Sequence, residues 1–410
     1  MTTLPFKKNI IRVMKIFVIA PGVCLFLLLN FFLTIRLGKI RSSRIGHFAG
    51  NTQLLLCLKN ETCKKRNKYL DIYFHEEIIS NHYLLKIWKR HFFIMPKFFS
   101  NYLYLVHTSL EYLADIFPYL QKIIIDYGLT DIDYRNSLSR HPKDIYLTDS
   151  ENEMGKNLLQ EMGIPPNSKI VLLHVRDSAY LKKSFPDQDF SYHDYRDSDI
   201  DNFKKAANYL VSEGFFVFRM GVVCEKPLNV KNKMIIDYCY DHDWSDFLDI
   251  YLASKCDFII TNGTGSDAIS SYIFRKPILN IDVLVQRGLL KFRKGLTTFV
   301  KYFDSSNSKQ ISLREINEIG VNECFSNECI LKHGINIQRL DSDEILNYTK
   351  DMVSFVRNNF GLDDKYIALN EKFLNTYISS LSQNELLEKS RVFEGYLCPT
   401  FLKSYRSWYQ

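Results

Sequence analysis

The chain has 410 residues, enough for two domains of ordinary size, and its 46% hydrophobic and 24% charged composition excludes an intrinsically disordered protein. The net charge of +7 is local, because residues 1–50 hold eight basic and no acidic residues and leave −1 for the other 360. A nucleic-acid-binding protein would spread basic residues over a domain face, so the distribution argues against that class.

The first basic residues flank an uncharged run of 20 residues, Ile16 to Ile35. The run has the length of a transmembrane helix, but it also fits a helix that only dips into the membrane, or an element of a soluble domain. No small-residue cleavage site follows it, which argues against a removed signal peptide. Because Asn30 interrupts the helical pattern and Phe31 to Ile40 is rich in strand formers, we expect a membrane-associating segment over residues 1–30 and a strand from about residue 31.

The next part of the chain, residues 31–147, predicts an irregular α/β domain. Strands are expected at 31–38, 69–75 and 122–126, and helices over TQLLLCL, ISNHYLLKIWKR and 109–117. The stretch RIGHFAGN, Arg44 to Asn51, joins the first strand to the first helix. Gly46 allows close backbone approach there, and His47 has a pKa suited to proton transfer near neutrality. The alternative for His47 is a histidine that caps or packs the helix.

A more regular domain is predicted over residues 148–300. Thr148 and Glu151 form a capping box for its first helix. Short apolar strands then alternate with amphipathic helices, which indicates βαβ units and a parallel sheet. Ligands bind outside the carboxyl ends of the strands in such sheets. The residues that follow each strand are therefore the candidates for a ligand-binding site.

Three predicted strand ends carry polar residues and glycines. The candidates for binding an anion are His174, Arg176, Asp177 and Tyr180 at the first end; Arg219 and Gly221 at the second; and Asn262, Gly263, Thr264, Gly265 and Ser266 at the third. A glycine-rich turn exposes backbone N–H groups, and a guanidinium group fits phosphate oxygens. The spacing matches neither GxxxxGK[ST] nor GxGxxG, so neither a P-loop nor a dinucleotide fingerprint is indicated. The alternative for the glycine turn alone is a tight turn with a helix cap.

The loop SYHDYRDSDID, Ser191 to Asp201, adds one more candidate. Arg196 can reach back over the first strand end, whereas Asp199 or Asp201 is expected to cap the following helix. The letters of Asp199-Ile200-Asp201 match a metal-binding DxD, but their position predicts a helix start.

The nine cysteines include no CxxC pair and no metal set with a histidine at a familiar spacing. Their odd number indicates reduced thiols in a cytoplasmic protein.

Several of these stretches together resemble one family of bacterial proteins that are predicted to be glycosyltransferases and are encoded in surface-polysaccharide gene clusters. The resemblance rests on RSSRIGHFAGNTQLLLC, HVRDSAYL, YRDSDIDNF, FRMG, SDFLDIYLASKCDFIITNGTGSDA and KPILNID. It covers most of residues 30–285 and continues more weakly to residue 410. More distantly, the His-x-Arg pattern is similar to the diphosphate-contacting motif of GT-B fucosyltransferases. The second arginine and later aspartate of that motif are missing, so a GDP-fucose donor does not follow.

The resemblance implies a GT-B fold, in which two Rossmann-like domains face each other across a cleft. Residues 31–147 would hold the acceptor, with Arg44, Gly46, His47 and Asn51 on that side, and residues 148–300 would hold the nucleotide-sugar. Residues 301–410 would form a helical extension that packs back on the N-terminal domain. No cofactor and no catalytic metal are expected.

The interpretation favoured by the sequence is a glycosyltransferase at the cytoplasmic face of the bacterial inner membrane. It would move a sugar from a nucleotide-sugar to a lipid-linked or oligosaccharide acceptor during surface-polysaccharide (O-antigen or capsule) biosynthesis. Two alternatives stay open: a GT-B-like sugar-nucleotide epimerase, against which the basic and apolar N-terminus argues, and a non-catalytic scaffold of an envelope assembly.

Overall fold

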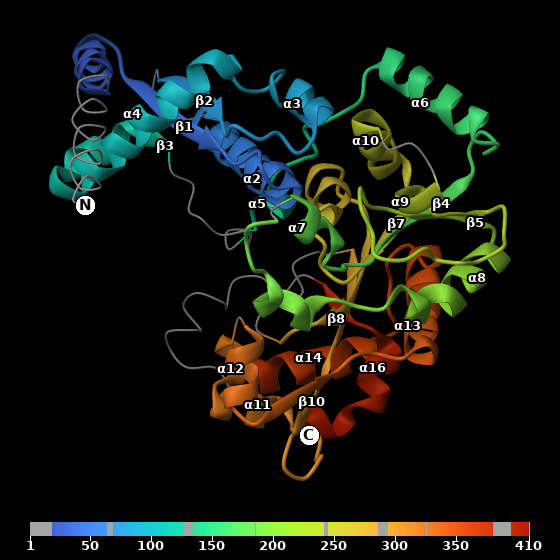
Figure 1. Cartoon of the computed structure of the whole chain (residues 1–410). Helices are drawn as coiled ribbons and strands as arrows, with labels where there is room; N and C mark the ends of the chain where they lie inside the picture. The colour runs from blue at the N-terminus through green and yellow to red at the C-terminus, as the bar shows by residue number, and fades with distance from the viewer. Residues whose placement is uncertain are drawn as a thin grey trace, which may run out of the picture. The chain divides into compact units, whose positions relative to one another are not determined.

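The computed structural model divides the chain into two compact units, Met1–Asp131 (unit 1) and Ile132–Gln410 (unit 2). Figure 1 shows their elements. The structure describes residues 19–63, 69–125, 133, 136–184, 186–241, 245–285, 294–324, 326–379, 395–409. The basic residues before residue 19 lie outside this part of the chain.

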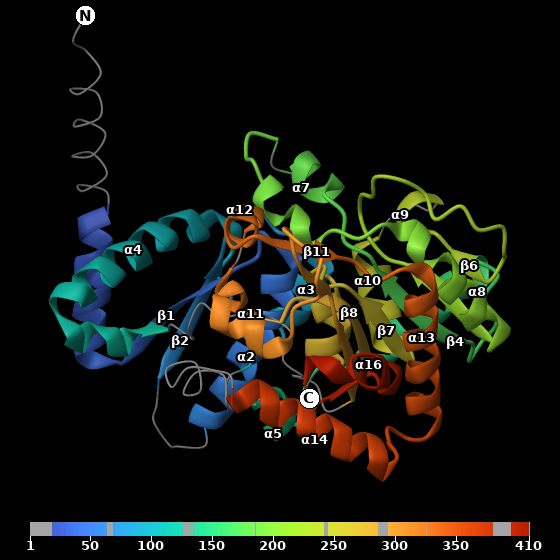
Figure 2. The same cartoon turned by 90° about the horizontal axis from the view of Figure 1, so that it is seen from below.

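Unit 1 is built on a three-stranded parallel sheet in the order β2-β1-β3. The strands are β1 (Ile35–Ile40), β2 (Leu70–His75) and β3 (Ile124–Ile125). The helices are a first helix over residues 19–32, α2 (Ile45–Cys63), α3 (His82–Trp88) and α4 (Lys97–Ile116). Helix 19–32 lies beside α4 in both views (Figures 1 and 2), and residues of the two helices share one core with β1.

The first helix of unit 1 ends near the predicted position, but the first strand begins later than predicted. Asn30 explains the boundary, because its side chain donates to the carbonyl of Phe26 at 3.0 Å and accepts from the N–H of Ile35 at 2.9 Å. The amide therefore turns the chain from the helix into β1. No helix in the described residues is both long and apolar enough to span a membrane.

Unit 2 contains a seven-stranded sheet in the order β12-β9-β8-β7-β4-β5-β6, in which all neighbours are parallel. The strands are β4 (Lys169–His174), β5 (Phe215–Arg219), β6 (Ile235–Ile236), β7 (Phe258–Thr261), β8 (Ile278–Val283), β9 (Gly295–Phe299) and β12 (Tyr396–Leu397). The predicted α/β class and the parallel sheet are confirmed. A separate antiparallel pair consists of β10 (Lys301–Asp304) and β11 (Ile335–Gln338).

The helices of unit 2 mostly join consecutive strands (Figure 1). The α-helices are α5 (Ser137–Arg140), α6 (Asp149–Glu161), α7 (Ala179–Ser184), α8 (Lys204–Ser212), α9 (Tyr238–Asp241), α10 (Asp246–Lys255), α11 (Leu313–Ile319), α12 (Asn327–Lys332), α13 (Ser342–Arg357), α14 (Asp364–Ser379) and α16 (Pro399–Ser404). Shorter helices are the 3₁₀ helices η2 (Ser191–Arg196), η3 (Ile200–Phe203), η5 (Val321–Glu323) and η6 (Arg406–Trp408) and the π-helix η4 (Ile269–Ile273). The capping box of Thr148 and Glu151 at the start of α6 is confirmed.

The order of the strands defines a switch point. From β4 the chain first adds β5 and β6 on one side, and then adds β7, β8 and β9 on the other. This is the doubly wound order in which ligands bind outside the carboxyl ends of the two central strands. In unit 2 these strands are β4 and β7.

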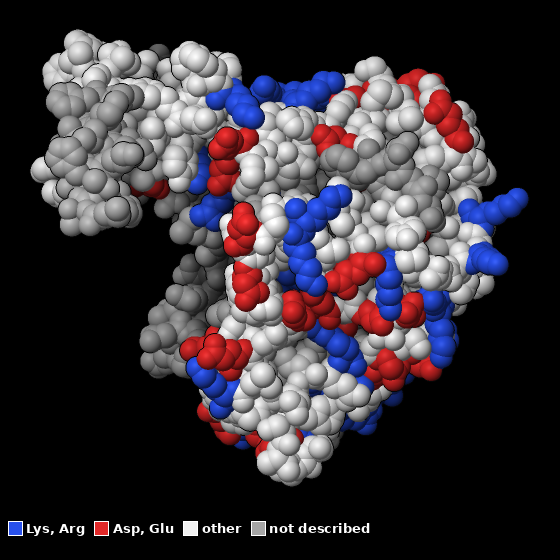
Figure 3. Space-filling view, in the orientation of Figure 1, with Lys and Arg blue, Asp and Glu red and all other residues white. Residues whose placement is uncertain are grey.

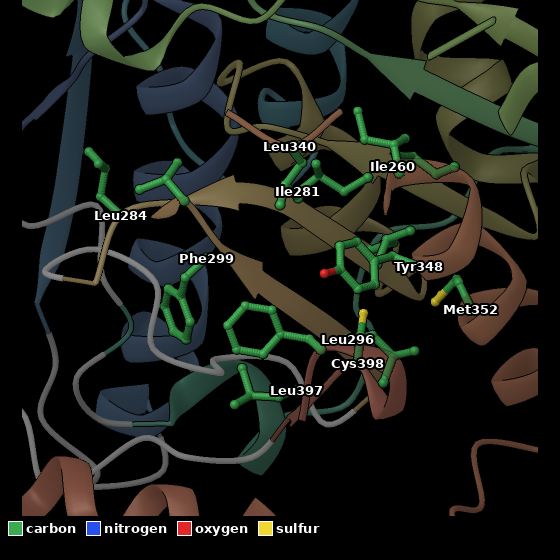
Figure 4. Close-up of a cluster of buried hydrophobic side chains, with 14 of the residues drawn as sticks. Ile260, Ile281, Leu284, Leu296, Phe299, Leu340, Tyr348, Met352, Leu397 and Cys398 are labelled. Carbon is green, nitrogen blue, oxygen red and sulfur yellow. The ribbon is translucent and has the colours of Figure 1, made fainter. Parts of the chain in front are cut away.

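The segment 301–410, predicted as a helical extension, belongs to unit 2. It supplies β12 to the edge of the large sheet and many side chains to the core of unit 2. Figure 4 shows Tyr348 and Met352 of α13, Leu296 and Phe299 of β9, and Leu397 and Cys398 in one buried cluster. The apolar face of α13 explains this packing, because β8 and β9 leave a buried surface for it to cover.

The cysteines also differ from the prediction, because Cys324 and Cys329 form a disulfide. Their Cα atoms are 5.4 Å apart, since η5 ends at Cys324 and the N-terminal turn of α12 folds back beside it. The other cysteines whose side chains the structure describes take part in no disulfide: Cys24, Cys57, Cys224, Cys239, Cys256 and Cys398.

Candidate functional site

The carboxyl ends of β4 and β7 are tied together by the side chain of Asn262. Its Oδ1 accepts from the N–H of Arg176 at 2.7 Å, and its Nδ2 donates to the carbonyl of Arg196 at 3.1 Å. The buried side chain of Asn262 thus joins three segments that sequence analysis selected separately. They are the residues after β4, the last residue of η2, and the glycine turn after β7. These segments form one site at the switch point.

The glycine turn, Asn262 to Ser266, has the backbone shape that its sequence requires. Gly263 and Gly265 have φ angles of 86° and 89°, a region that other residues rarely adopt. The hydroxyl of Thr261 fixes the turn, because it accepts from the N–H of Gly263 at 2.9 Å and donates to Asp267 at 2.6 Å. The hydroxyls of Thr264 and Ser266 lie 3.0 Å apart. The turn leads into a short helical segment that becomes the π-helix η4.

His174 lies beneath this turn, at the last position of β4. Its Nδ1 is 2.9 Å from the hydroxyl of Ser266, and its Nε2 has no hydrogen-bond partner among the described residues. Burial lowers the pKa of His174 to about 4, although the charge of Asp267 acts in the opposite direction. The imidazole is therefore neutral near pH 7, and it serves as a hydrogen-bonding group rather than as a cation.

Arg176 and Arg196 bring positive charge to the site from two elements. The Nε of Arg176 donates to Asp197 at 3.0 Å, and the terminal amino group of Arg196 donates to the carbonyl of Gly263 at 2.9 Å. Burial raises the pKa of Asp197, and the charge of Arg176 only partly offsets that effect. The four remaining N–H donors of the Arg176 guanidinium belong to its two terminal amino groups, which are the part of the fork that binds oxyanions.

A third arginine behind this pair, Arg339, was missed by sequence analysis. It donates to the backbone carbonyls of Tyr195 and Asp282, and so connects the segment before α13 to η2 and to β8. Asp282 in turn accepts from the hydroxyl of Ser198 at 2.9 Å. The arginine holds the loop that carries Arg196. A single arginine between a strand and a capping box gives no sequence signal for such a long-range contact.

Two candidates, Arg219 and Asp177, are structural residues rather than open ligand-binding groups. The side chain of Arg219 is 2% exposed, donates to the carbonyl of Lys226 at 2.5 Å and pairs with Asp237 at 3.3 Å. Asp177 accepts from the N–H groups of Ala179 and Glu225 at 3.1 and 3.0 Å. The charge of Arg219 is thus paired within the protein, and its buried side chain does not face the site openly.

The remaining candidates of unit 2 are Gly221 and Tyr180. Gly221 has a φ angle of 152°, and a Cβ there would lie 2.9 Å from the sulfur of Cys239, so close packing explains this glycine. Tyr180 is half-buried on α7. As expected, Asp199 caps η3, and both Asp199 and Asp201 pair with Lys226 at 2.6 Å.

The candidates in unit 1 lie on a helix rather than on the expected loop. Because α2 begins at Ile45, Gly46, His47 and Asn51 occupy its first turns, and Arg44 is exposed just before them. The Nδ1 of His47 is 3.4 Å from Oδ1 of Asn51, one helical turn away.

Glu76, just after β2, was missed in this region. It accepts from the N–H and hydroxyl of Ser43 at 3.0 and 2.5 Å and pairs with Lys39 at 3.2 Å. Burial raises the pKa of Glu76, but the Ser43 hydrogen bonds and Lys39 outweigh it, so the pKa is lowered overall. A carboxylate held in this way is a weak base, and it fixes the start of α2 against the end of β2.

Comparisons with known proteins identify no family. No protein-family model matches the chain, and no curated protein matches it. Among solved structures it is similar to the ADP-heptose lps heptosyltransferase II of E. coli, with 10% identity and a TM-score of 0.39 over 64% of this chain and 90% of that chain. It is also similar to a glycosyl transferase family 9 protein from Veillonella parvula, with 10% identity and a TM-score of 0.40 over 65% and 86% of the respective chains. At this level of identity and structural similarity, the two likenesses do not decide the function of the chain.

Proposed function

We propose that the protein is a GT-B glycosyltransferase that moves a sugar from a nucleotide-sugar to an acceptor in bacterial surface-polysaccharide biosynthesis. One observation carries the proposal: Arg176, Arg196 and the glycine turn of residues 262–266 converge at the carboxyl ends of β4 and β7. Switch points of doubly wound sheets bind nucleotides, and the groups present here suit a diphosphate. The family resemblance of the HVRDSAYL stretch, Asn262 and the surrounding motifs supports the same conclusion.

The residues of this site would act on the leaving nucleoside diphosphate. When the bond to the sugar breaks, negative charge grows on the diphosphate. The amino groups of Arg176 and the backbone N–H groups of the glycine turn can stabilise that charge, as fixed donors do in many transferases. Neutral His174 would support the turn through Ser266. No step in this scheme requires a metal or a cofactor.

The acceptor would bind to unit 1, where His47 is our candidate for the base that deprotonates its hydroxyl. His47 is half-buried on the first turn of α2. Replacing it, His47→Gln, is expected to lower the turnover number by ~10²–10⁴ and to leave nucleotide affinity unchanged. Normal turnover of this variant would make the histidine structural.

Binding of nucleoside diphosphates tests the donor site directly. Thermal-shift screening against UDP, GDP and dTDP, with the monophosphate CMP included, first identifies the best nucleoside diphosphate. Isothermal titration then compares wild type with Arg176→Ala, for which we expect roughly ten- to a hundredfold weaker binding, since charge-assisted hydrogen bonds contribute ~1.5–3 kcal/mol. The matched control is Arg357→Ala, which removes the same charge from a pair with Glu213 at the end of α13. Equal affinities of the wild type and a folded Arg176→Ala would refute the donor site.

We further propose that the enzyme attaches to the cytoplasmic face of the bacterial inner membrane through unit 1. Helix 19–32 exposes large apolar side chains, with Leu28, Phe31 and Phe32 exposed by 61, 84 and 80%. Figure 3 shows almost no charge over this helix and the adjoining part of α4, whereas charges of both signs cover unit 2. An apolar helix face next to a basic segment is typical of proteins that lie on an anionic bilayer. A lipid-linked acceptor would be presented at that surface.

Co-sedimentation with vesicles of phosphatidylethanolamine and phosphatidylglycerol tests this attachment. Deleting residues 1–18 removes four basic residues, each contributing ~1 kcal/mol near an anionic surface, and the double variant Phe31→Ser/Phe32→Ser removes apolar contact. Both are expected to release protein from the vesicles. The control double variant Tyr146→Ser/Tyr240→Ser changes exposed aromatic residues of unit 2 and should stay bound. A longer deletion is unsuitable, because Val23 and Phe26 belong to the core of unit 1. Wild-type protein that ignores the vesicles would contradict attachment.

A further inference from the structure

Cys324, Cys329 and His333 form a side-chain cluster that the proposed transfer reaction does not use. Their ligand atoms all lie within 4.8 Å of one another. Within the residues that the structure describes, this is the only group of three or more His, Cys, Asp or Glu side chains close enough to share a metal ion. The spacing Cys-x4-Cys-x3-His was not recognised as a metal set in the sequence.

Local structure explains why these residues meet. Ser326 caps α12 by accepting from the N–H of Cys329 at 3.2 Å, which fixes the direction of the helix. Cys329 and His333 are four residues apart at the end of α12, so their side chains share one helix face. The Nδ1 of His333 is 2.8 Å from the carbonyl of Cys329 and 3.5 Å from the sulfur of Cys324.

We propose that Cys324, Cys329 and His333 bind one Zn²⁺ ion when the cysteines are reduced, and that the disulfide is the metal-free, oxidised form of the same site. A dithiol reductant supplies the two electrons and two protons that convert the disulfide to two thiols, and becomes a disulfide itself. Zinc then displaces the two thiol protons and binds both sulfurs and one imidazole nitrogen.

The composition and geometry of the cluster favour zinc. Thiolate and imidazole are the ligands that zinc prefers. Tetrahedral Zn–S bonds of ~2.3 Å place ligand atoms ~3.5–3.8 Å apart, and the distance of 3.5 Å between Cys324 Sγ and His333 Nδ1 is already in this range. Binding requires that the two sulfurs separate and that the ring of His333 turns a nitrogen without a proton toward them, because its Nδ1 now lies 2.8 Å from the carbonyl of Cys329. Because Cys324 is buried while His333 is exposed, the ion can enter from the side of the histidine.

The cluster adjoins the proposed donor site through α12. The side chain of Asn327, the first residue of α12, donates to the carbonyl of Ser191 at 3.1 Å. Ser191 begins η2, the turn that carries Arg196. A bound metal ion would thus stabilise η2, which carries Arg196. The metal site itself does not depend on the proposed transferase activity.

Cobalt binding to the whole protein tests the proposal without an activity assay. Protein reduced with dithiothreitol and desalted without oxygen is titrated with Co²⁺, which gives intense visible bands in tetrahedral thiolate sites, and the cobalt is then displaced with Zn²⁺. We expect one equivalent in reduced wild type and none in oxidised protein. His333→Gln should bind Co²⁺ at least roughly tenfold more weakly, since the loss of even a residue that only hydrogen-bonds to a metal ligand has an effect of that size. Cys329→Ser should lose the visible absorption bands of the bound cobalt.

The control variant is Cys224→Ser, which changes another cysteine pair, because the thiols of Cys224 and Cys239 interact with each other. It is expected to bind cobalt like wild type. Circular dichroism checks that each variant is folded. Reduced wild type without thiolate bands, or unchanged bands in folded Cys329→Ser, would overturn the proposal. Neither result would affect the donor site, which the nucleotide titration tests separately.

Discussion

Arg219 is a buried cation whose partners are two acidic side chains of its own unit. It pairs with Asp237 at 3.3 Å and lies 3.7 Å from Asp177. Replacing one member of a buried pair leaves the other charged and unpaired, which typically costs ~3–5 kcal/mol. Arg219→Met is therefore expected to lower the free energy of unfolding of unit 2 by that amount, as measured by urea denaturation.

The double variant Arg219→Met/Asp237→Asn is the control for this prediction. It removes both charges, so much of the lost stability should return. If Arg219→Met is as stable as wild type, Arg219 does not form these ion pairs. It would then again be a candidate phosphate ligand.

His174 makes the stability of unit 2 depend on pH. Unfolded histidine has a pKa of about 6.5, whereas burial lowers the folded-state pKa to about 4. The unfolded state therefore binds the proton first as pH falls. The contribution of neutral His174 to the free energy of unfolding is complete above pH 6.5. It is lost progressively between pH 6.5 and 4, by about 3 kcal/mol in total.

Urea denaturation of wild type and His174→Gln at pH 7 and pH 4.5 isolates this contribution from the other titrating groups. The variant should lose about 2–3 kcal/mol less than wild type between the two pH values. The same loss in both proteins would mean that His174 is accessible to protons in the folded state.

At the scale of single elements, α6 shows how much a cap contributes. The side chains of Thr148 and Glu151 each accept from the other residue's backbone N–H, at 3.2 and 2.8 Å. Thr148→Ala is expected to lower the free energy of unfolding by about 1 kcal/mol, because it leaves an N–H group of the first turn without its partner. The control Ser354→Ala changes an exposed residue inside α13 and should have little effect. Equal stability of both variants would mean that water replaces the cap fully.

The elements that could be predicted well from the sequence are those that a local sequence pattern determines. Strands β4, β5 and β7 are mainly apolar runs bounded by turns, β8 is apolar at four of its six positions, and the capping box marks α6. Helix α4 was predicted only from residue 109, although it starts at Lys97, because aromatic residues in its first half weaken the helical signal. Strand β12 has two residues and exists only because β9 offers a partner.

The same distinction applies to the candidate site. Residues that follow a parallel strand share one edge of the sheet, so His174, Arg176 and Asn262 could be predicted together. The roles of Arg219 and Arg339 depend on contacts with Asp237 and Asp282, which are 18 and 57 residues away in the sequence. Periodicity carries no information about such contacts, so the burial and pairing of Arg219 were not foreseen and Arg339 was missed.

At the scale of the whole molecule, each unit has its own buried tryptophan. Trp408 donates to the carbonyl of Ile311 at 2.7 Å in unit 2, and Trp88 donates to the carbonyl of Phe48 at 3.0 Å in unit 1. Substituting a buried tryptophan with alanine typically costs ~3–5 kcal/mol. Trp408→Ala should lower the urea concentration at which nucleotide binding is lost, whereas Trp88→Ala should change it little. Equal effects of the two variants would mean that the units unfold together.

The position of β12 has a consequence for synthesis on the ribosome. Unit 1 has a core made only of residues before 125, so that core is available early in translation. Unit 2 needs Leu397, Trp408 and Tyr409 for its core, and cannot close its sheet until they emerge. At ~5–20 residues per second, the apolar edge of β9 would stay uncovered for roughly 5–20 seconds after its own synthesis. Chaperones that bind exposed apolar strands would have that interval in which to act on the nascent chain.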